Sequence, residues 1–245
     1  MQESKPITRL FSENGLKRNK TIELGSGPAH KLRSVLRAQT GDEITLFNAQ
    51  DGEWRAVLDS IGKNKASATC QNQLRTPRPE PGPWLAFAPL KKDRLDQIVE
   101  KAVELGAERL IPVITARTEN RRVKIERLYQ QVIDAAEQCE RLSVPLVDEP
   151  IPLSKLALVW PKDRTLFVGA ERRDAKPLVS QAANTPPPHG ILVGPEGGFE
   201  AQELDAVLKL TISTPVNLGP RILRAETAAI AALAVLQAQA GDWRN

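Results

Sequence analysis

The sequence predicts an α/β protein in which a small β-rich domain precedes a larger domain of alternating strands and helices. Three observations carry this prediction. Short strand-like runs dominate residues 1–72, prolines alternate with other residues over 73–83, and strand-like and helix-like runs alternate over 84–245. Such alternation is typical of a mostly parallel sheet with helices on both faces. With 245 residues and 41% hydrophobic content, the chain is long enough for one large domain or two modest ones.

The first 72 residues predict a small β-barrel. Their strand-like runs are short and bounded by Gly, Asp and Asn, which favours an all-β unit of this kind. One helical segment, residues 29–37, lies among them. The expected strands cover residues 21–24, 43–47, 54–61 and 67–70.

Residues 73–83 predict a stiff linker between the two domains. Proline fixes its own φ and favours an extended conformation in the residue before it, so this segment does not suit a helix or a central strand. We therefore expect the small domain over 1–72 and the large domain over 84–245.

The large domain is predicted to begin with a strand over 84–90 and a helix from Asp93. A strand over 110–115 follows, and apolar residues at helical spacing from Ile125 to Ala136 predict the next helix. The remaining strands and the last helix are expected over 165–169, 191–194 and 215–218 and from Arg224 onward.

Charge and residue usage narrow the functional classes. The net charge of +4 is a mild basic bias concentrated in residues 1–72, which favours an acidic partner, although ordinary solubility charge explains it equally well. Cys70 and Cys139 lack metal-ligand spacing and suit reduced thiols. His30 and His189 are too few for a zinc site or a Ser/His/Asp site, so we expect no metal.

The N-terminus and the hydropathy of the chain indicate its compartment. The first residues lack the apolar region of a secretory leader, and no apolar run reaches the roughly 20 residues of a membrane span. We expect a soluble, cytoplasmic protein without a membrane partner.

Two segments near the C-terminus predict a ligand site. In each, a buried-strand pattern ends at glycine, with Gly194-Pro195-Glu196-Gly197-Gly198 in the first and Leu218-Gly219 in the second. Ligands bind at the carboxyl ends of strands in α/β sheets. Neither segment matches a dinucleotide or P-loop fingerprint, and a glycine pair alone is more often a plain turn.

The start of the last helix adds charge to the second segment. Arg221, Arg224 and Glu226 cluster before an otherwise apolar run, where charges are unfavourable unless they are paired or face a cleft. A purely structural Arg224–Glu226 ion pair is the alternative. Two such segments in one α/β domain favour a site.

Basic residues form loose groups in both domains. Each group alone is typical of a solvated face, but together they suit an extended polyanion that is bound through its phosphates. With five Phe, four Trp and one Tyr in the chain, recognition by shape and pocket is favoured over a row of stacked bases. The groups are Lys17-Arg18-Lys20, Lys91-Lys92-Arg94, Arg117 with Arg121-Arg122-Lys124, and Arg172-Arg173.

An ordered series of motifs runs through nearly the whole chain. The motifs are Arg9 with Phe11, His30, Val35-Leu36-Arg37, Gly41-Asp42, Lys91 with Asp93-Arg94, Lys101 with Glu104-Leu105-Gly106, Glu137-Gln138 with Arg141, and the two glycine segments through Ala228. With them the chain resembles the ribosomal RNA small subunit methyltransferase E family of the knotted (SPOUT-type) methyltransferases. Cys139 stands where this family often has serine.

The resemblance implies a fold and a cofactor. It implies a PUA-like RNA-binding domain followed by an α/β domain whose last segments form a trefoil knot, and it implies a homodimer. It also implies that S-adenosylmethionine is held by the two glycine loops and the turn near Gly169. The implied cofactor residues are Gly169, Leu192, Gly194, Pro195, Glu196, Gly197, Gly198, Leu218, Gly219, Ile222, Leu223, Arg224, Thr227 and Ala228.

The resemblance also implies methylation of N3 of one uridine in 16S ribosomal RNA within the small subunit. Deprotonated uracil needs a cation nearby, for which Arg224, Arg9 and Arg141 are candidates, and Glu226 or Glu196 is a candidate to take the proton or to order the loop. The target base must be unpaired or flipped out. The expected RNA-binding residues are Arg9, Lys17, Arg18, His30, Arg37, Lys91, Lys92, Arg121 and Arg122.

Two other functions remain open at this point. A knotted methyltransferase acting on transfer RNA or on another ribosomal site would share these motifs. A non-catalytic RNA-binding assembly factor would share the fold, but the intact glycine loops with Arg224 and Glu226 argue against it.

Overall fold

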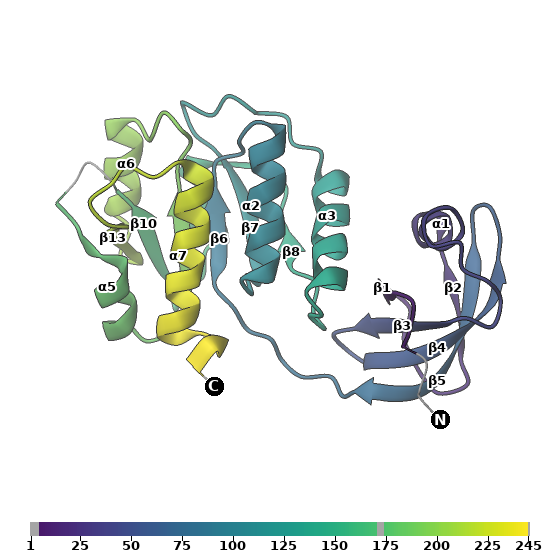
Figure 1. Ribbon diagram of the computed structural model, residues 1–245. Coiled ribbons are helices and arrows are strands. Elements are labelled where there is room, and N and C mark those ends of the chain that lie inside the picture. The colour runs from purple at the N-terminus through teal and green to yellow at the C-terminus, as the bar shows by residue number, and fades with distance from the viewer. Residues whose placement is uncertain (1–4, 171–173, 245) are drawn as a thin grey trace. The chain divides into compact units, whose positions relative to one another are not determined.

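The computed structural model describes residues 5–170 and 174–244 (Figure 1). The chain divides into two compact units. The first comprises Met1–Glu80 and Ala136–Val144, and the second comprises Pro81–Ala135 and Pro145–Asn245. A short segment from the later part of the sequence therefore belongs to the first unit.

The first unit is built on a five-stranded sheet in the order β1-β3-β4-β5-β2. β1 and β3 are parallel, and the other pairs are antiparallel. All four expected strands are present, while β1 is too short for its alternation to be recognised in the sequence. The strands are β1 (Arg9–Phe11), β2 (Thr21–Leu24), β3 (Glu43–Asn48), β4 (Gly52–Ile61) and β5 (Ala66–Arg75).

The expected helical segment of this unit consists of two short pieces. α1 (Ser26–His30) continues into a π-helical turn over Lys31–Val35. Ala29 and Leu32 are fully buried and pack with alternate strand residues such as Ile22 and Leu46. A single apolar side of this segment therefore closes the core of the unit.

β5 extends into the segment predicted as a linker. Gln73 pairs with Trp54 and Arg75 pairs with Glu53 of β4, across a β-bulge. Residues 73–75 are thus strand rather than linker, because β4 continues far enough to pair with them. The irregular proline-rich stretch covers 76–83.

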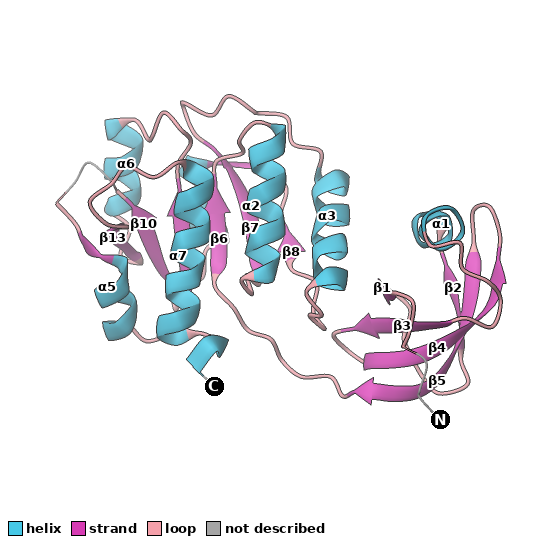
Figure 2. Cartoon of the chain, viewed as in Figure 1, coloured by secondary structure: helices cyan, strands magenta, loops and turns pink. Residues whose placement is uncertain are grey.

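The second unit contains a parallel sheet in the order β11-β13-β10-β12-β6-β7-β8. β8 and β9 both pair with β7, β8 near its start and β9 near its end. Figure 2 labels β6, β7, β8, β10 and β13 of this sheet. Every pair in this sheet is parallel, as the alternation of elements predicts. The strands are β6 (Trp84–Phe87), β7 (Arg109–Ile114), β8 (Leu146–Val147), β9 (Ile151–Pro152), β10 (Thr165–Gly169), β11 (Lys176–Pro177), β12 (His189–Val193) and β13 (Ser213–Asn217).

Helices cover both faces of this sheet. On one face, α7 (Ala225–Ala240) packs against α2 (Lys92–Glu104), α5 (Leu178–Asn184) and strands β6 and β12. On the other face, a core of alternate strand side chains packs with residues of α6 (Ala201–Leu208) and with Leu156 and Trp160 at α4 (Leu156–Val159). The remaining helices are α3 (Ile125–Gln138) and the 3-10 turns Leu153–Lys155 and Asp242–Arg244.

The strand order brings the two glycine segments to the same edge. β12 and β13 flank β10, although β13 follows β12 in the sequence. Because the strands are parallel, the loops after β12 and after β13 both leave from the carboxyl edge, on either side of the end of β10. In the described parts of the chain, no helix combines the length and hydrophobicity that crossing a bilayer requires.

Candidate functional site

A cavity of about 380 Å³ lies at the carboxyl edge of β10, β12 and β13. Its volume falls in the range of small-molecule pockets, and its position is the usual ligand edge of an α/β sheet. Its wall contains most of the residues implied to bind the cofactor: Gly169, Gly194, Pro195, Glu196, Gly197, Gly198, Leu218, Gly219, Ile222, Leu223, Arg224 and Ala228.

Two of the implied cofactor residues do not line this cavity. Leu192 is fully buried in the core beneath it, because alternate residues of β12 face the helix layer. Thr227 is exposed on the first turn of α7.

The first glycine loop forms a tight turn over residues 195–198. The Gly198 N–H donates to the Pro195 carbonyl at 2.8 Å, and Gly198 has φ +67°, a conformation that side-chain-bearing residues rarely adopt. Arg117 Nη1 donates to the Gly197 carbonyl at 2.7 Å from the loop after β7. Glycine is therefore required by the backbone of this turn.

The second glycine loop is shaped in the same way. Gly219 has φ +105°, and its N–H donates to Asn217 Oδ1 at 3.2 Å. The chain then runs to Arg224, which is extended and immediately precedes the first residue of α7. The first turn of α7 thus contributes Ala225 and Ala228 to the cavity wall.

Arg94 of α2 joins the acidic residues of both segments. Its Nη1 donates to Glu196 Oε1 at 2.8 Å, and its Nε lies 3.7 Å from Glu226 Oε1. Among the described residues no Arg224–Glu226 ion pair forms, so the structural pair considered from the sequence is replaced by Arg94–Glu226. Glu226 is buried and does not line the cavity, whereas Glu196 does.

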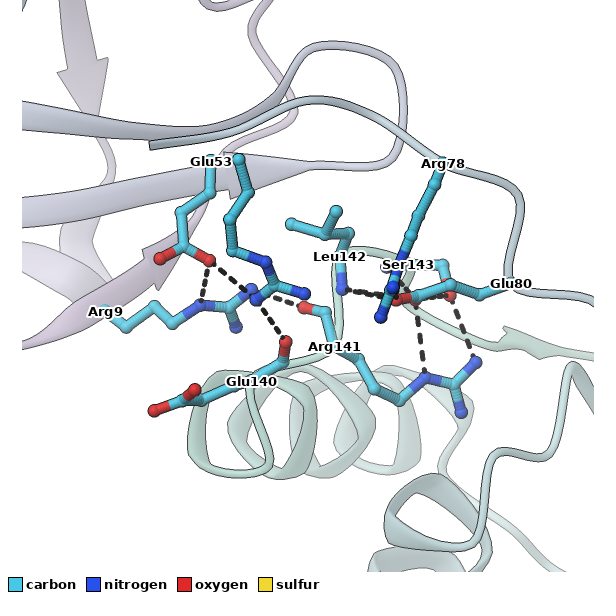
Figure 3. A network of polar contacts seen from close by, with 9 residues as sticks. Arg9, Glu53, Arg78, Glu80, Glu140, Arg141, Leu142 and Ser143 are labelled. Carbon is cyan, nitrogen blue, oxygen red and sulfur yellow. Dashed lines mark hydrogen bonds and ion pairs between the residues drawn. The ribbon is translucent and has the colours of Figure 1, made fainter. Parts of the chain in front are cut away.

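The other two arginines predicted to act in catalysis belong to the first unit (Figure 3). The Arg9 Nε donates to Glu53 at 3.2 Å, its Nη1 donates to the Ala136 carbonyl at 2.8 Å, and its Nη2 donates to the Arg141 carbonyl. Its Cζ lies 3.4 Å from the centroid of the Phe47 ring. Burial lowers the pKa of Arg9, and Glu53 opposes this shift. Every guanidinium nitrogen of Arg9 is thus engaged by the protein.

Arg141 lies in the turn over residues 141–143, and Glu80 holds this turn. Arg141 Nη2 donates to Ser143 Oγ at 3.1 Å, and its Nε is 4.0 Å from Glu80. Glu80 Oε2 accepts from the Leu142 N–H at 3.1 Å and the Ser143 N–H at 2.9 Å (Figure 3). Burial acts to raise the pKa of the Glu80 carboxyl, but these hydrogen bonds outweigh burial and lower it.

The residues expected to bind RNA are exposed, except for Arg9. In the first unit, Lys17 and Arg18 lie in the turn before β2, while His30 and Arg37 lie at the helical segment. In the second unit, Lys91 and Lys92 begin α2, and Arg121 and Arg122 lie between β7 and α3. The Arg172-Arg173 group falls outside the described residues.

Three residues that shape the site were not among those predicted to form it. The sequence places Arg94 in a basic group and in the motif Lys91 with Asp93-Arg94, and it places Arg117 in a basic group. Asn217 carries no motif beyond its place before Leu218-Gly219. Their contacts with loops distant in the sequence come from the tertiary structure. Only Asn217, an amide residue directly before a glycine segment, has a position in the sequence that indicates a place at the site.

Comparison with known proteins defines the class of this chain. Residues 79–237 match the RNA methyltransferase domain, and residues 32–69 match the RNA methyltransferase PUA domain. The first match covers more than half of the chain, so the α/β unit with its edge cavity is an RNA methyltransferase domain.

Individual relatives narrow this class. The protein named ribosomal RNA small subunit methyltransferase E from Rickettsia conorii is 36% identical over 230 residues, which is 92% of this chain and 93% of that protein. Its namesake from Synechocystis is 32% identical and covers 89% of this chain and 73% of that protein. A crystal structure of the namesake from Neisseria gonorrhoeae bound to S-adenosyl methionine has 30% identity and a TM-score of 0.84, covering 95% of this chain and 98% of that one. The chain belongs to the ribosomal RNA small subunit methyltransferase E family. The predicted fold class, a PUA-like domain before a SPOUT-type α/β domain, is confirmed at this level.

Proposed function

We propose that the chain is an S-adenosylmethionine-dependent methyltransferase that modifies N3 of one uridine in the 16S RNA of the small ribosomal subunit. The observation that carries this proposal is the single cavity walled by both glycine loops at the carboxyl edge of the sheet. The Neisseria gonorrhoeae relative with S-adenosyl methionine bound supports the cofactor. The family supports ribosomal RNA as the substrate.

The residues around the cavity suit this cofactor. The two loops present backbone N–H and carbonyl groups, while Val193, Leu218 and Leu223 give apolar surface for an adenosyl group. Glu196 offers a carboxylate to a cationic ligand on the same wall. When bound, the cofactor supplies a methyl group already activated on a sulfonium, so the protein mainly needs to align it with the base.

The residues of this chain then have separate tasks. Arg224 is exposed at the cavity and is placed to stabilise the charge of a deprotonated uracil or to hold its phosphate. Glu196 is the acid on the cavity wall and is the better placed of the two candidates to accept the N3 proton. Glu226 is buried against Arg94 and orders the start of α7. We assign Arg9 and Arg141 to positioning within the first unit, because their side chains are engaged there.

The exposed basic residues would bind the substrate through its phosphates. The PUA-like unit would contribute Lys17, Arg18, His30 and Arg37, and the second unit would contribute its own exposed basic residues. We further propose a homodimer in the cytoplasm and a knotted threading of the last segments. β13 lies between β11 and β10, whereas β12, which precedes β13 in the sequence, lies on the other side of β10, and this strand order supports that threading. A second copy would cover Ile222, which is 76% exposed beside the cavity.

Labelled cofactor and purified protein, offered to small ribosomal subunits that lack the modification, test this function. The expected result is one methyl group incorporated per subunit, mapped to N3 of a single uridine in 16S RNA. Label in transfer RNA or at another ribosomal site would overturn the proposed identity of the substrate. An absence of transfer to any RNA would overturn the activity and favour an assembly factor.

A further inference from the structure

Arg94 joins three segments of the second unit that are far apart in the sequence. It lies in the first turn of α2, and its Nη1 donates to Glu196 Oε1 at 2.8 Å in the loop after β12. Its Nε lies 3.7 Å from Oε1 of Glu226, in the first turn of α7. One guanidinium group therefore contacts both the first glycine loop and the helix that begins directly after the second.

We propose that Arg94 is a positioning residue that holds the two glycine loops in one arrangement around the cavity. The proposal rests on the proposed function in one respect, since it takes this cavity as the cofactor pocket. Among the described residues, Glu196 lines the cavity, whereas Arg94 and Glu226 do not. Glu226 instead adjoins Arg224 and Ala225, which do line it. Arg94 therefore acts on a bound molecule through the loops.

The two contacts of Arg94 differ in their surroundings. The side chains of Arg94 and Glu196 are each 39% exposed, so water and salt screen this ion pair. The Glu226 side chain is only 9% exposed, and its Oε2 has no hydrogen-bond partner among the described residues. Without Arg94, this buried carboxylate would lose its cation, which is strongly unfavourable for the start of α7.

Both contacts together require a guanidinium group. Nη1 faces Glu196 while Nε faces Glu226, so the planar fork reaches two carboxylates on different segments at once. The ammonium of a lysine is a single point charge and cannot reproduce this spacing. Lysine would keep the charge of the site but lose the bridge between the loops.

Hydrogen exchange of the full chain without ligand tests the proposal directly. In Arg94→Ala and Arg94→Lys we expect amide exchange about tenfold faster in peptides covering both 194–199 and 218–226. The matched control is Lys101→Ala on the same helix, whose partners Glu100 and Glu104 also lie on α2. It should leave both loops unchanged. Faster exchange confined to α2, or wild-type exchange in both loops, would overturn the proposal.

Calorimetric titration with S-adenosylmethionine gives a second readout. We expect about tenfold weaker binding to both Arg94 variants and no change for Lys101→Ala. Wild-type affinity in Arg94→Lys would show that a positive charge alone suffices, and it would overturn the proposal that a guanidinium group must join the two loops. A wild-type protein that binds no cofactor would instead overturn the proposed function, while the exchange experiment would still decide the role of Arg94.

Adding Glu226→Gln to Arg94→Ala separates positioning from simple structural support. The added substitution removes the unpaired buried charge, so thermal stability should return towards the wild-type value. Loop exchange should remain fast and cofactor binding weak, because the bridge is still absent. Recovery of cofactor affinity together with stability would overturn the positioning role.

Discussion

Two arginines predicted to act in catalysis, Arg9 and Arg224, occupy opposite kinds of surroundings. The Arg9 side chain is 11% exposed, stacks on Phe47 and donates from every guanidinium nitrogen to the protein. Arg224 is exposed at the cavity wall, directly before α7. A cation whose nitrogens are each engaged by the protein holds its own unit together, whereas one that faces a cavity is available to a ligand. Residue type alone does not separate these two roles.

Replacing the exposed arginine should have the largest effect. Arg224→Ala should lower the single-turnover rate of methyl transfer by about 10²–10³-fold, because the developing charge loses its cation. Cofactor affinity, measured by calorimetry, should stay close to the wild-type value. Lys209→Ala, an exposed charge at the end of α6, controls for net charge. Loss of cofactor affinity in Arg224→Ala would reassign Arg224 to the binding pocket.

Replacing the buried arginine should affect stability rather than chemistry. Arg9→Ala leaves the largely buried Glu53 with Arg75 as its one remaining ion-pair partner among the described residues, and it leaves two carbonyls without their donor. The free energy of unfolding in urea should therefore fall by about 3 kcal/mol. Arg9→Lys should recover only part of this loss. If Arg9→Ala lost methyl transfer while its stability stayed unchanged, Arg9 would have a catalytic role and not a structural one.

The Glu80 contacts make the same unit sensitive to acid. The pKa of Glu80 is lowered below the ordinary glutamate value of 4.5, so its stabilising contribution is present above that pH and is lost as pH falls through the folded pKa. Glu80→Gln should lower the unfolding free energy at pH 7 by about 1.5–3 kcal/mol, the range typical of a hydrogen bond to a charged group. In urea titrations at pH 3 the difference from wild type should shrink. A difference that stayed constant with pH would contradict this assignment.

The smallest effect is expected from a single exposed basic residue. Lys17→Ala should weaken binding to small-subunit RNA about two- to threefold and reduce the slope of log affinity against log salt by about one. Glu13→Ala, an exposed neighbour of opposite charge, is the control and should not weaken binding. An unchanged salt slope in Lys17→Ala would remove this turn from the RNA-binding surface.

Much of the fold followed from periodicity and turn chemistry. The four longer strands of the first unit and the alternating elements of the second have patterns that belong to single segments. β1 has only three residues, which is too short for an alternating pattern to appear in the sequence. The prolines near residues 73–75 predict a linker, and only the pairing with β4 in the folded chain shows that these residues form a strand.

The residues of the site also differ in whether the sequence alone indicates them. Gly198 and Gly219 mark the two loops in the sequence because a positive φ requires glycine there. The bridge from Arg94 to Glu196 and Glu226, and the engagement of Arg9 by the carbonyls of Ala136 and Arg141, join residues that only the folded chain brings together. Sequence therefore located the cavity but could not separate the arginine that faces it from those that hold structure.

Calorimetry with S-adenosylmethionine on two glycine variants tests whether the loops after β12 and β13 form the cofactor pocket. Gly219→Val forces a branched side chain into φ +105° in the second loop, so we predict cofactor binding at least about tenfold weaker than wild type. Gly25→Val lies before α1, where φ is −69° and no atom within 4 Å meets an added Cβ. It should bind the cofactor as wild type does. Equal cofactor affinity in the wild type and in Gly219→Val would show that these loops do not form the cofactor pocket.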